Sequence, residues 1–402
     1  MKLNQFEISI LPQIIFGAGT IKKLPEKITN YGKKVLLITG DSSLSKSDYW
    51  TQLQSDFFDL KIELIVFKVS DEPSAKLVDQ AVSKFQYSSI EVVVGIGGGS
   101  VLDAAKAIAG LLPFGNSIMD HLEGVGKGIE YLGSALPFIA VPTTAGTGSE
   151  ATKNAVISER GENGYKKSFR HETLVPKLAI VDSELLISCS AAQIAANGMD
   201  AFTQLIESYV STKANHFTDA LALDGIKAVV EGFIFAWQGG NTKDAIFGRN
   251  KMAYASLISG ITLAQVGLGS VHGLASPLGA FFPIPHGVVC GTLLAEATRV
   301  NITAMNQREP KNIALEKYSH IGKMLLEDEV LKSKITQQKS LDYLVQVLHE
   351  WTTMLKIPKL SNYGVTKQKF DKIISECRGS SMQTNPIVLL DNEIEVILNK
   401  RL

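Results

Sequence analysis

Two histidines and one aspartate have the residue types and the setting of a metal site. His272 and His286 lie in residues 252–295, a long run that contains no Asp, Glu, Lys or Arg. Asp200 lies well inside a helical pattern over residues 191–212, with no basic residue four positions away. A buried carboxylate needs a counter-charge or a cation, and carboxylate with imidazole suits Zn²⁺ or Fe²⁺. We therefore predict that Asp200, His272 and His286 are the catalytic metal ligands.

Two further polar residues share the helical face of Asp200. Gln204 and Glu207 follow it by four and seven positions, which places the three side chains on one side of a helix. The carbonyl oxygen of Gln204 is a weaker, neutral candidate for a fourth metal ligand. The alternative is that both histidines are core residues with hydrogen-bond partners and that Asp200 forms a local ion pair. The presence of all three residues in one chain favours a metal site.

The charge-free run over residues 252–295 is also long enough to suggest a membrane span. We reject that interpretation, because Pro277, Pro283 and Pro285 would interrupt a spanning helix and polar residues are scattered through the run. We interpret it as the buried centre of a helical domain, and we expect no membrane partner.

A glycine-rich turn follows a strand predicted over residues 90–96. Gly97, Gly98, Gly99 and Ser100 lead directly into a helical pattern. Glycines allow the backbone to approach a ligand closely, and a helix N-terminus offers free amides to a pyrophosphate. The run departs from the six-residue dinucleotide fingerprint, which would have glycine in place of Ser100. Taken alone, a tight strand-to-helix turn explains it equally well.

A second loop rich in hydrogen-bond donors follows the next predicted strand, residues 137–141. It carries four hydroxyl side chains, those of Thr143, Thr144, Thr147 and Ser149. Ligands of open α/β sheets bind at the carboxyl ends of the strands. Two such loops on consecutive strands therefore predict the binding of phosphate and ribose groups.

The elements that carry these residues change in kind near residue 185. Before it, apolar runs alternate with helical patterns, which is typical of a doubly wound parallel sheet; these runs are residues 35–38, 62–67, 90–96, 137–141 and 178–181. After it, long helical patterns take over at residues 191–212, 217–237, 244–266, 290–305, 313–327 and 338–355. We predict a Rossmann-like α/β nucleotide-binding domain over residues 1–185 and an all-α metal- and substrate-binding domain over residues 186–402.

The composition limits the classes of partner. Lys+Arg and Asp+Glu number 40 each, so nothing favours a nucleic-acid partner. The three cysteines, Cys189, Cys290 and Cys377, form no CxxC pair and cannot all be paired in disulfides. Together with an N-terminus that lacks the apolar core of a signal peptide, this predicts a cytoplasmic protein.

These motifs and their order resemble the iron-containing (group III) alcohol dehydrogenase family over nearly the whole chain. The matching stretches are residues 16–19, 97–106, 142–150, 179–182, 198–202, 271–275 and 285–287. The resemblance implies a dehydroquinate synthase-like fold, in which metal and substrate lie in a cleft between a nucleotide-binding domain and a helical domain. We also expect a homodimer or a higher homo-oligomer.

The resemblance implies a variant metal site. The metal ligands of the family are one Asp and three His, of which Asp200, His272 and His286 match three. The fourth falls on Gln204, whose amide oxygen should bind a borderline-soft metal more weakly. A further, non-ligand His of the family falls on Ser276, which can pass a proton only within a chain of hydroxyls or waters.

The resemblance also assigns cofactor contacts. In the family, the loop after the first strand of the nucleotide-binding sheet selects the cofactor, and here it begins with Gly40, Asp41 and Ser42. Gly and Ser leave room for a 2′-phosphate, whereas Asp41 would repel one, and we expect NAD(P) with a preference for NADP. Asp103 belongs to the glycine-rich motif of the family, and Lys166, or its neighbour Lys167, matches a family lysine near the cofactor.

The implied function is that of a metal-dependent, NAD(P)-linked alcohol dehydrogenase, or an aldehyde or ketone reductase. Hydride would pass between the nicotinamide and a small alkoxide or carbonyl held by Fe²⁺ or Zn²⁺. One alternative is a dehydroquinate synthase-like lyase, which would want Glu at Asp200 and many basic residues. Another is a nucleotide-binding relative whose metal site has decayed, as Gln204 and Ser276 would suggest.

Overall fold

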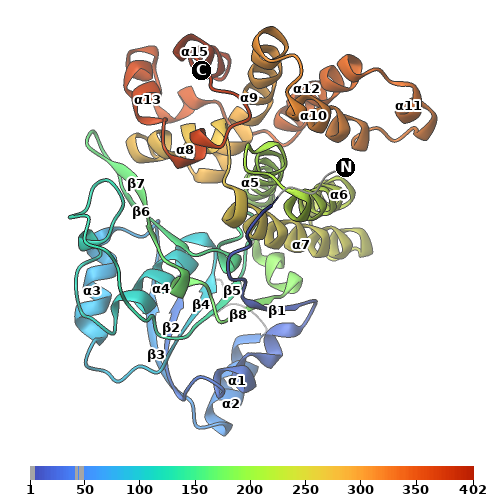
Figure 1. Cartoon of the computed structure of the whole chain (residues 1–402). Coiled ribbons are helices and arrows are strands. Elements are labelled where there is room, and N and C mark those ends of the chain that lie inside the picture. Colours follow the sequence, from blue (N-terminus) through green and yellow to red (C-terminus); the bar gives the residue numbers. More distant parts are fainter. Residues whose placement is uncertain (1–4, 41–43, 45–48) are drawn as a thin grey trace.

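The computed structural model describes residues 5–40, 44 and 49–402, and its N-terminal part is built on a six-stranded, fully parallel sheet (Figure 1). In their order across the sheet, the strands are β1 (Gln13–Phe16), β8 (Leu178–Val181), β5 (Phe138–Pro142), β4 (Val92–Gly97), β2 (Lys34–Thr39) and β3 (Glu63–Lys68). The four inner strands are almost entirely buried, and their sequences are continuous apolar runs for that reason.

Helices cover both faces of the sheet, because alternate residues of each strand point to opposite sides. On one face, Leu36 and Ile38 of β2 belong to the core beneath α3 (Ala75–Phe85) and α4 (Gly99–Leu111). On the other face, Val35 and Leu37 pack with α1 (Leu24–Ile28) and α2 (Tyr49–Asp59).

An antiparallel hairpin, β6 (Asn154–Glu159) and β7 (Tyr165–Arg170), leaves the sheet after β5. The sequence did not predict it, because Lys166, Lys167 and Ser168 interrupt the apolar pattern of β7. The hairpin packs on α4, and it brings Lys166 towards the helical part of the molecule.

After β8 the described chain is helical. The α-helices are α5 (Ala191–Val210), α6 (His216–Gln238), α7 (Lys243–Val266), α8 (Ser270–Phe281), α9 (His286–Arg308), α10 (Ile313–Met324), α11 (Glu329–Lys334), α12 (Gln337–Met354), α13 (Phe370–Glu376), α14 (Ser380–Gln383) and α15 (Asp391–Lys400). The predicted fold class, a parallel α/β part followed by an all-helical part, is confirmed.

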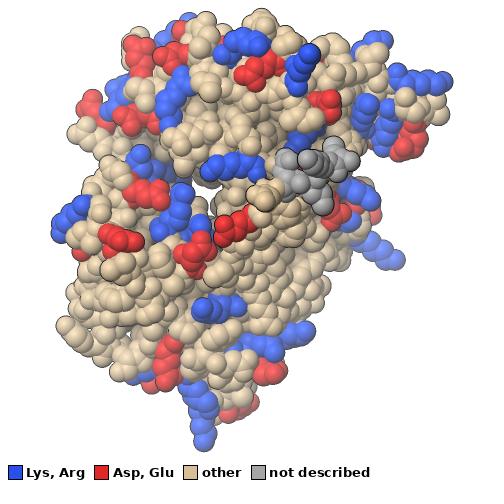
Figure 2. Space-filling view, in the orientation of Figure 1, with Lys and Arg blue, Asp and Glu red and all other residues tan. Residues whose placement is uncertain are grey.

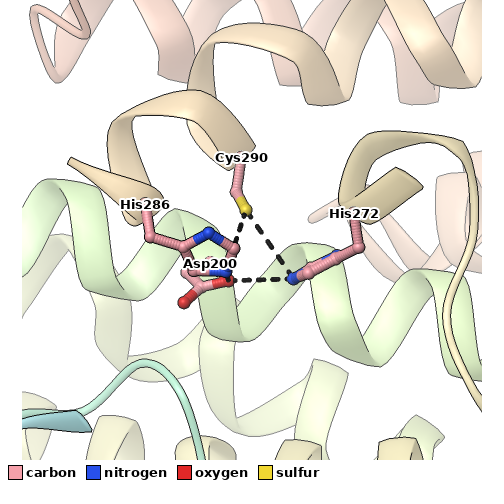
Figure 3. A group of neighbouring side chains, drawn as sticks. All are labelled: Asp200, His272, His286 and Cys290. Carbon is pink, nitrogen blue, oxygen red and sulfur yellow. Dashed lines mark hydrogen bonds and ion pairs between the residues drawn. The ribbon is translucent and has the colours of Figure 1, made fainter. Parts of the chain in front are cut away.

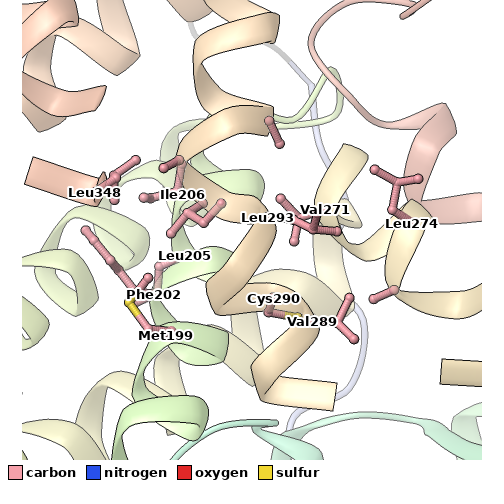
Figure 4. Close-up of a cluster of buried hydrophobic side chains, with 14 of the residues drawn as sticks. Met199, Phe202, Leu205, Ile206, Val271, Leu274, Val289, Cys290, Leu293 and Leu348 are labelled. Carbon is pink, nitrogen blue, oxygen red and sulfur yellow. The ribbon is translucent and has the colours of Figure 1, made fainter. Parts of the chain in front are cut away.

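Helix α5 packs against α6, α7 and α9, and its apolar side chains enter the cluster shown in Figure 4. Its residues Met199, Phe202 and Leu205 are fully buried. They pack in one hydrophobic core with residues of α8, α9 and α12, such as Val271 and Leu293. This burial on all sides explains why α5 carries small residues and why any polar side chain on it must find a partner.

The charge-free run folds as the end of α7, the whole of α8 and the start of α9. Helix α8 continues through Pro277, and a 99° bend at residues 267–269 separates it from α7. Gly267 ends α7 with a positive φ of 72°, a conformation that favours glycine. Within the described part of the chain, no single helix is long and apolar enough to cross a membrane, and only the bent pair of α7 and α8 together meets that requirement of length and composition.

The two parts of the molecule approach each other closely at a pair of glycines. A Cβ atom added to Gly148, in the loop after β5, would lie 2.4 Å from the Cα of Gly260 in α7. A Cβ added to Gly260 would lie 2.1 Å from the carbonyl oxygen of Gly148. This contact sets the loop that follows β5 directly on the helical part.

On the face shown in Figure 2, acidic and basic side chains are interspersed.

Candidate active site

A cleft of about 1520 Å³ lies between the carboxyl edge of the sheet and the helical part. The chain passes from β2 outward to β3 and then back to β4 on the other side of β2, so the strand order reverses between β2 and β4. Ligands of open α/β sheets bind at such a switch point. Most of the candidate site residues line this cleft: Gly40, Gly98, Gly99, Ser100, Asp103, Thr143, Thr144, Thr147, Ser149, Lys166, Asp200, Gln204, His272, Ser276 and His286.

Four donor side chains converge at one place in the helical part (Figure 3). Single atoms of Asp200 on α5, His272 on α8, and His286 and Cys290 on α9 all lie within 4.8 Å of one another. Oδ1 of Asp200 lies 3.2 Å from Nε2 of His272 and 3.8 Å from Nε2 of His286. Sγ of Cys290 lies 3.7 Å from Nε2 of His272 and 3.9 Å from Nε2 of His286. The three residues predicted as ligands are thus brought together, with a thiol that the sequence analysis did not include.

The imidazole of His272 is held by a carboxylate on its far side. Nδ1 of His272 donates to Oε2 of Glu207 at 2.7 Å, while Oε1 of Glu207 accepts the backbone N–H of Val271 at 2.7 Å. This leaves Nε2 of His272 as the nitrogen that faces Asp200 and Cys290. Nδ1 of His286 has no partner among the residues that the structure describes.

The buried charges of the cluster shift one another. Burial opposes ionisation of Asp200, but the nearby His286 and His272 outweigh it and lower the pKa of Asp200 to about 2. Burial opposes the charged form of His272 too, yet its contacts with Cys290, Glu207 and Asp200 raise the pKa of His272 well above its usual value. Burial dominates at His286, lowering its pKa to about 4, and at Cys290, raising its pKa to about 12.

Gln204 lies beside the cluster, but its polar atoms are directed differently from our expectation. Its amide Nε2 donates to Oδ1 of Asp200 at 3.2 Å, and its carbonyl oxygen accepts a hydrogen bond from the hydroxyl of Ser259 at 2.7 Å. The oxygen expected as a ligand therefore already has a partner, and the amide helps to orient Asp200.

Ser276 joins α8 to the hairpin. Its hydroxyl donates to the backbone carbonyl of Lys166 at 3.0 Å. The side chain of Lys166 forms a 2.8 Å ion pair with Glu72, a cleft residue that the sequence analysis missed. Although burial opposes its ionisation, the pKa of Glu72 is lowered by this partner. Ser276 thus contacts the backbone of a lysine whose side chain is paired with a carboxylate in the cleft.

The glycine-rich turn and the hydroxyl-rich loop contact each other across the start of α4. A Cβ on Gly99 would lie 2.7 Å from the side chain of Thr147, and a Cβ on Gly98 would lie 3.3 Å from Thr144. Only small residues at the helix start permit this approach, which brings free backbone amides and threonine hydroxyls to one surface. Gly97 does not line the cleft: it packs on Val101, and its carbonyl oxygen accepts the N–H of Thr143.

A buried lysine of α4 anchors the hydroxyl-rich loop and the start of the hairpin. Nζ of Lys106 donates to the backbone and side-chain oxygens of Ser149 at 2.9 and 3.0 Å, and to Thr152 and the carbonyl of Asn154. The carboxylate of Asp103 accepts from the hydroxyl of Ser149 at 2.5 Å and from a backbone N–H of the hairpin. Asp103 thus organises the loop, besides facing the cleft.

The cofactor-selecting loop is described only in part. Gly40 follows β2 and lines the cleft, while Asp41 and Ser42 lie outside the described residues. Lys68, the last residue of β3, is the register partner of Thr39, so a basic residue ends the strand beside Gly40.

Comparison with known proteins identifies the class of this architecture. The family model described as iron-containing alcohol dehydrogenase matches residues 12–183, and that of the C-terminal part of the Fe-containing alcohol dehydrogenase family matches residues 194–402. The chain belongs to the iron-containing alcohol dehydrogenase family, which confirms the resemblance. It is accordingly an oxidoreductase of alcohols that uses a nicotinamide cofactor.

Individual relatives cover the whole chain. Alcohol dehydrogenase 4 of Saccharomyces cerevisiae is 31% identical over 395 residues, which are 97% of each chain. The crystal structure of a 1,3-propanediol oxidoreductase superposes with a TM-score of 0.88 at 27% identity, covering 99% of this chain and 100% of the other. Sulfoacetaldehyde reductase of Bifidobacterium kashiwanohense, solved with NAD⁺, gives 0.83 at 25% identity, covering 99% of each chain.

The roles of Cys290 and Glu207 in the metal cluster region were not predicted, for two different reasons. The helical pattern that we expected from residue 290 in fact begins at His286. Counted from His286, Cys290 lies one helical turn further and therefore on the same face. Glu207 was placed on the face of Asp200, but its pairing with His272 depends on the packing of α5 against α8, which local periodicity does not encode.

Proposed function

We propose that the cleft binds NAD(P) at the sheet edge and a divalent cation between Asp200, His272 and His286, and that it interconverts small alcohols with aldehydes or ketones. The observation that carries the proposal is the convergence of the four donor atoms within 4.8 Å, in the cleft that the glycine turn and the threonine loop also line. An aspartate and two imidazoles form a donor set suited to Fe²⁺ or Zn²⁺.

The residues of the chain position the reactants. A cation in this cluster would supply Lewis acidity towards the substrate oxygen, and the nicotinamide would exchange the hydride. Asp200 and His272 are almost fully buried, whereas 26% of the His286 side chain is exposed, so a substrate would reach the cluster from the side of His286. Burial of Asp200 and His272 strengthens each electrostatic contact between them.

Ser276 offers no titratable group near neutral pH, but it contacts the backbone of Lys166, which forms an ion pair with Glu72 in the cleft. Both charges act on His286: Lys166 lowers the pKa of His286, and Glu72 raises it. We propose that protons move between the substrate oxygen and solvent through hydroxyls and waters along this side.

We propose a preference for NADP. Gly40 leaves space at the end of β2 for a 2′-phosphate, and Lys68 supplies a basic residue at the neighbouring strand end. Comparing kcat/KM for NADPH and NADH tests the preference. In Asp41→Ala the ratio should move further towards NADPH, and a ratio that stays unchanged would mean that Asp41 does not select the cofactor.

We further propose a cytoplasmic homodimer or higher homo-oligomer whose domains divide near residue 185. The division is supported by the hydrophobic cores: the two cores of the sheet contain no residue after Leu185, whereas the core around α5 is formed mainly by later residues. Light scattering of the purified protein measures the oligomeric state, and limited proteolysis locates the division.

Family membership sets the lyase alternative aside, and the remaining rival is a decayed metal site. The Gln204 and Ser276 positions support that rival, whereas the tight donor cluster supports a working site. Metal analysis of the purified protein, with a screen of NAD(P)H oxidation over aldehydes, separates the two. We expect the protein to bind metal tightly and to turn over aldehydes, and we expect His272→Ala to abolish turnover. Absence of both metal binding and turnover would favour a decayed site.

A further inference from the structure

Cys290 differs from the other two cysteines in its surroundings. The thiols of Cys189 and Cys377 donate to backbone carbonyls, at 3.3 Å to Thr143 and 3.2 Å to Ile374. The sulfur of Cys290 has no such partner in the described chain; its neighbours are the Nε2 atoms of the two histidines of the cluster, besides Asp200. Cys290 is also fully buried, so its sulfur can contact only groups that lie inside the cluster.

The distances around Cys290 fit a shared tetrahedral ion. With metal–nitrogen or metal–oxygen bonds of about 2.0–2.1 Å and a metal–sulfur bond of about 2.3 Å, tetrahedral geometry separates neighbouring ligand atoms by about 3.3–3.6 Å. The observed separations, 3.7 and 3.9 Å from sulfur to nitrogen and 3.2 and 3.8 Å from Asp200 oxygen to nitrogen, lie close to these values. Small side-chain rotations would therefore close the site around a cation.

Gln204 leaves a ligand position for the sulfur to fill. Its carbonyl oxygen accepts from Ser259, and its amide hydrogen points at Asp200. With Gln204 occupied in this way, Asp200 and the two histidines provide only three donors. The sulfur of Cys290, one helical turn after His286, is the fourth donor within reach.

We propose that the Cys290 thiolate is the fourth protein ligand of the metal, replacing the donor that Gln204 does not supply, and that this sulfur makes the site selective for Zn²⁺ over Fe²⁺. The inference rests on the proposed metal-dependent function. Binding exchanges one proton for one bond: the Cys290 S–H gives its proton to solvent as the sulfur–metal bond forms, with no change of oxidation state. The charges of Asp200 and Cys290 then balance the two charges of the cation, which favours binding in a buried, apolar cluster.

The chemical softness of the sulfur ligand determines which metal ion the site prefers. Thiolate is a soft ligand that suits Zn²⁺, and Zn²⁺ also accepts imidazole and carboxylate ligands at tetrahedral spacing. A catalytic zinc ion needs a position open to substrate, and the partly exposed side of His286 leaves room for one beside the four protein ligands. The site would thus remain open to substrate with four protein ligands in place.

Absorption of the Co²⁺-loaded full-length protein tests the sulfur bond directly, without turnover. We expect a sulfur-to-cobalt charge-transfer band in the near ultraviolet, absent from Cys290→Ser and kept by Cys377→Ser, which changes a buried thiol elsewhere. Co²⁺ bound in stoichiometric amount without this band would overturn the inference and leave the proposed function standing. Failure of the wild-type protein to bind Co²⁺ or Zn²⁺ at all, with no turnover of any aldehyde, would overturn both.

Competition between metals tests the selectivity. Wild-type protein reconstituted without oxygen in equal Fe²⁺ and Zn²⁺ should retain mainly Zn²⁺, and Cys290→Ser should lower the Zn²⁺:Fe²⁺ ratio by about tenfold or more, as removal of a soft ligand predicts. The double variant Cys290→Ser with Gln204→His should regain the total amount of bound metal, but its Zn²⁺:Fe²⁺ ratio should stay low. A ratio equal to that of wild type in Cys290→Ser would contradict the assignment.

Discussion

The carboxylate of Glu207 bridges His272 and the backbone at the start of α8, accepting from Nδ1 of His272 and from the N–H of Val271, each at 2.7 Å. One residue on α5 therefore sets both the helix start and the imidazole that it carries. A carboxylate behind a metal-binding histidine fixes the ring and raises its basicity as a ligand. Glu207 is accordingly a positioning residue of the proposed metal site.

Glu207→Gln should weaken Zn²⁺ binding by about 10- to 100-fold, because the amide no longer orients His272 as an anion does. Competition with a chromogenic chelator measures the affinity. Glu296→Gln is the matched control, since Glu296 is also a buried carboxylate of the helical part and pairs with His349. Equal losses in both variants would mean that the effect is one of general stability.

Gln204→His should raise the affinity for Fe²⁺ and Zn²⁺, because an imidazole is a stronger donor than an amide that hydrogen-bonds Ser259 and Asp200. The dissociation constants of both metals are compared with those of the wild-type protein by the same competition. Unchanged affinity would indicate that the side chain at position 204 cannot turn towards the cluster.

Gly99→Ala should raise the Kd for NADPH by about tenfold or more, a cost of about 1.4 kcal/mol. The added Cβ would lie 2.7 Å from Thr147 and would push the helix start away from the hydroxyl-rich loop. Quenching of protein fluorescence by NADPH reports the Kd. Gly379→Ala, at a cleft glycine with open space around it, should leave the Kd close to that of wild type. The same Kd in both variants would argue against binding at the start of α4.

Glu150→Gln should remove a pH dependence of stability. Burial raises the pKa of Glu150 from 4.5 to about 7, so its contribution to stability is fully present below pH 4.5 and is lost as the pH rises to 7 and above. A shift of this size corresponds to at most about 3 kcal/mol. Thermal unfolding midpoints at pH 5 and pH 7.5 should differ less in Glu150→Gln than in wild type. An identical difference in both proteins would place the pH dependence elsewhere.

Lys106, whose burial lowers its pKa to about 8, contributes a separate change in stability between pH 8 and 10.5.

Much of this architecture was predictable from local sequence patterns. The buried strands are apolar runs that end in glycine or polar turns, and the helices around α5 are long segments rich in apolar residues, so the parallel sheet and the helical part followed from them. The hairpin β6–β7 escaped prediction, because half-buried lysines hide its alternation. Helix α8 was obscured by Pro277, which it tolerates within a buried setting.

The site was predictable only as far as residue types reveal it. Asp200, His272 and His286 stand out as polar residues in apolar surroundings, whereas Cys290 resembles any small core residue until α9 is traced back to His286. The orientation of the Gln204 amide depends on Ser259, which lies far along the chain on α7. Contacts between helices of this kind decide which atoms face the cluster, and no local pattern records them.

We propose that the Asp200–His272–His286 cluster holds a metal required for alcohol and carbonyl chemistry. The rate of NADPH oxidation with a small aldehyde, measured before and after removal of metal by a chelator and again after addition of one equivalent of Zn²⁺ or Fe²⁺, tests it most directly. We predict loss of turnover on removal and its recovery on addition, with no recovery in His272→Ala. Full turnover by protein shown to be free of metal would contradict the claim.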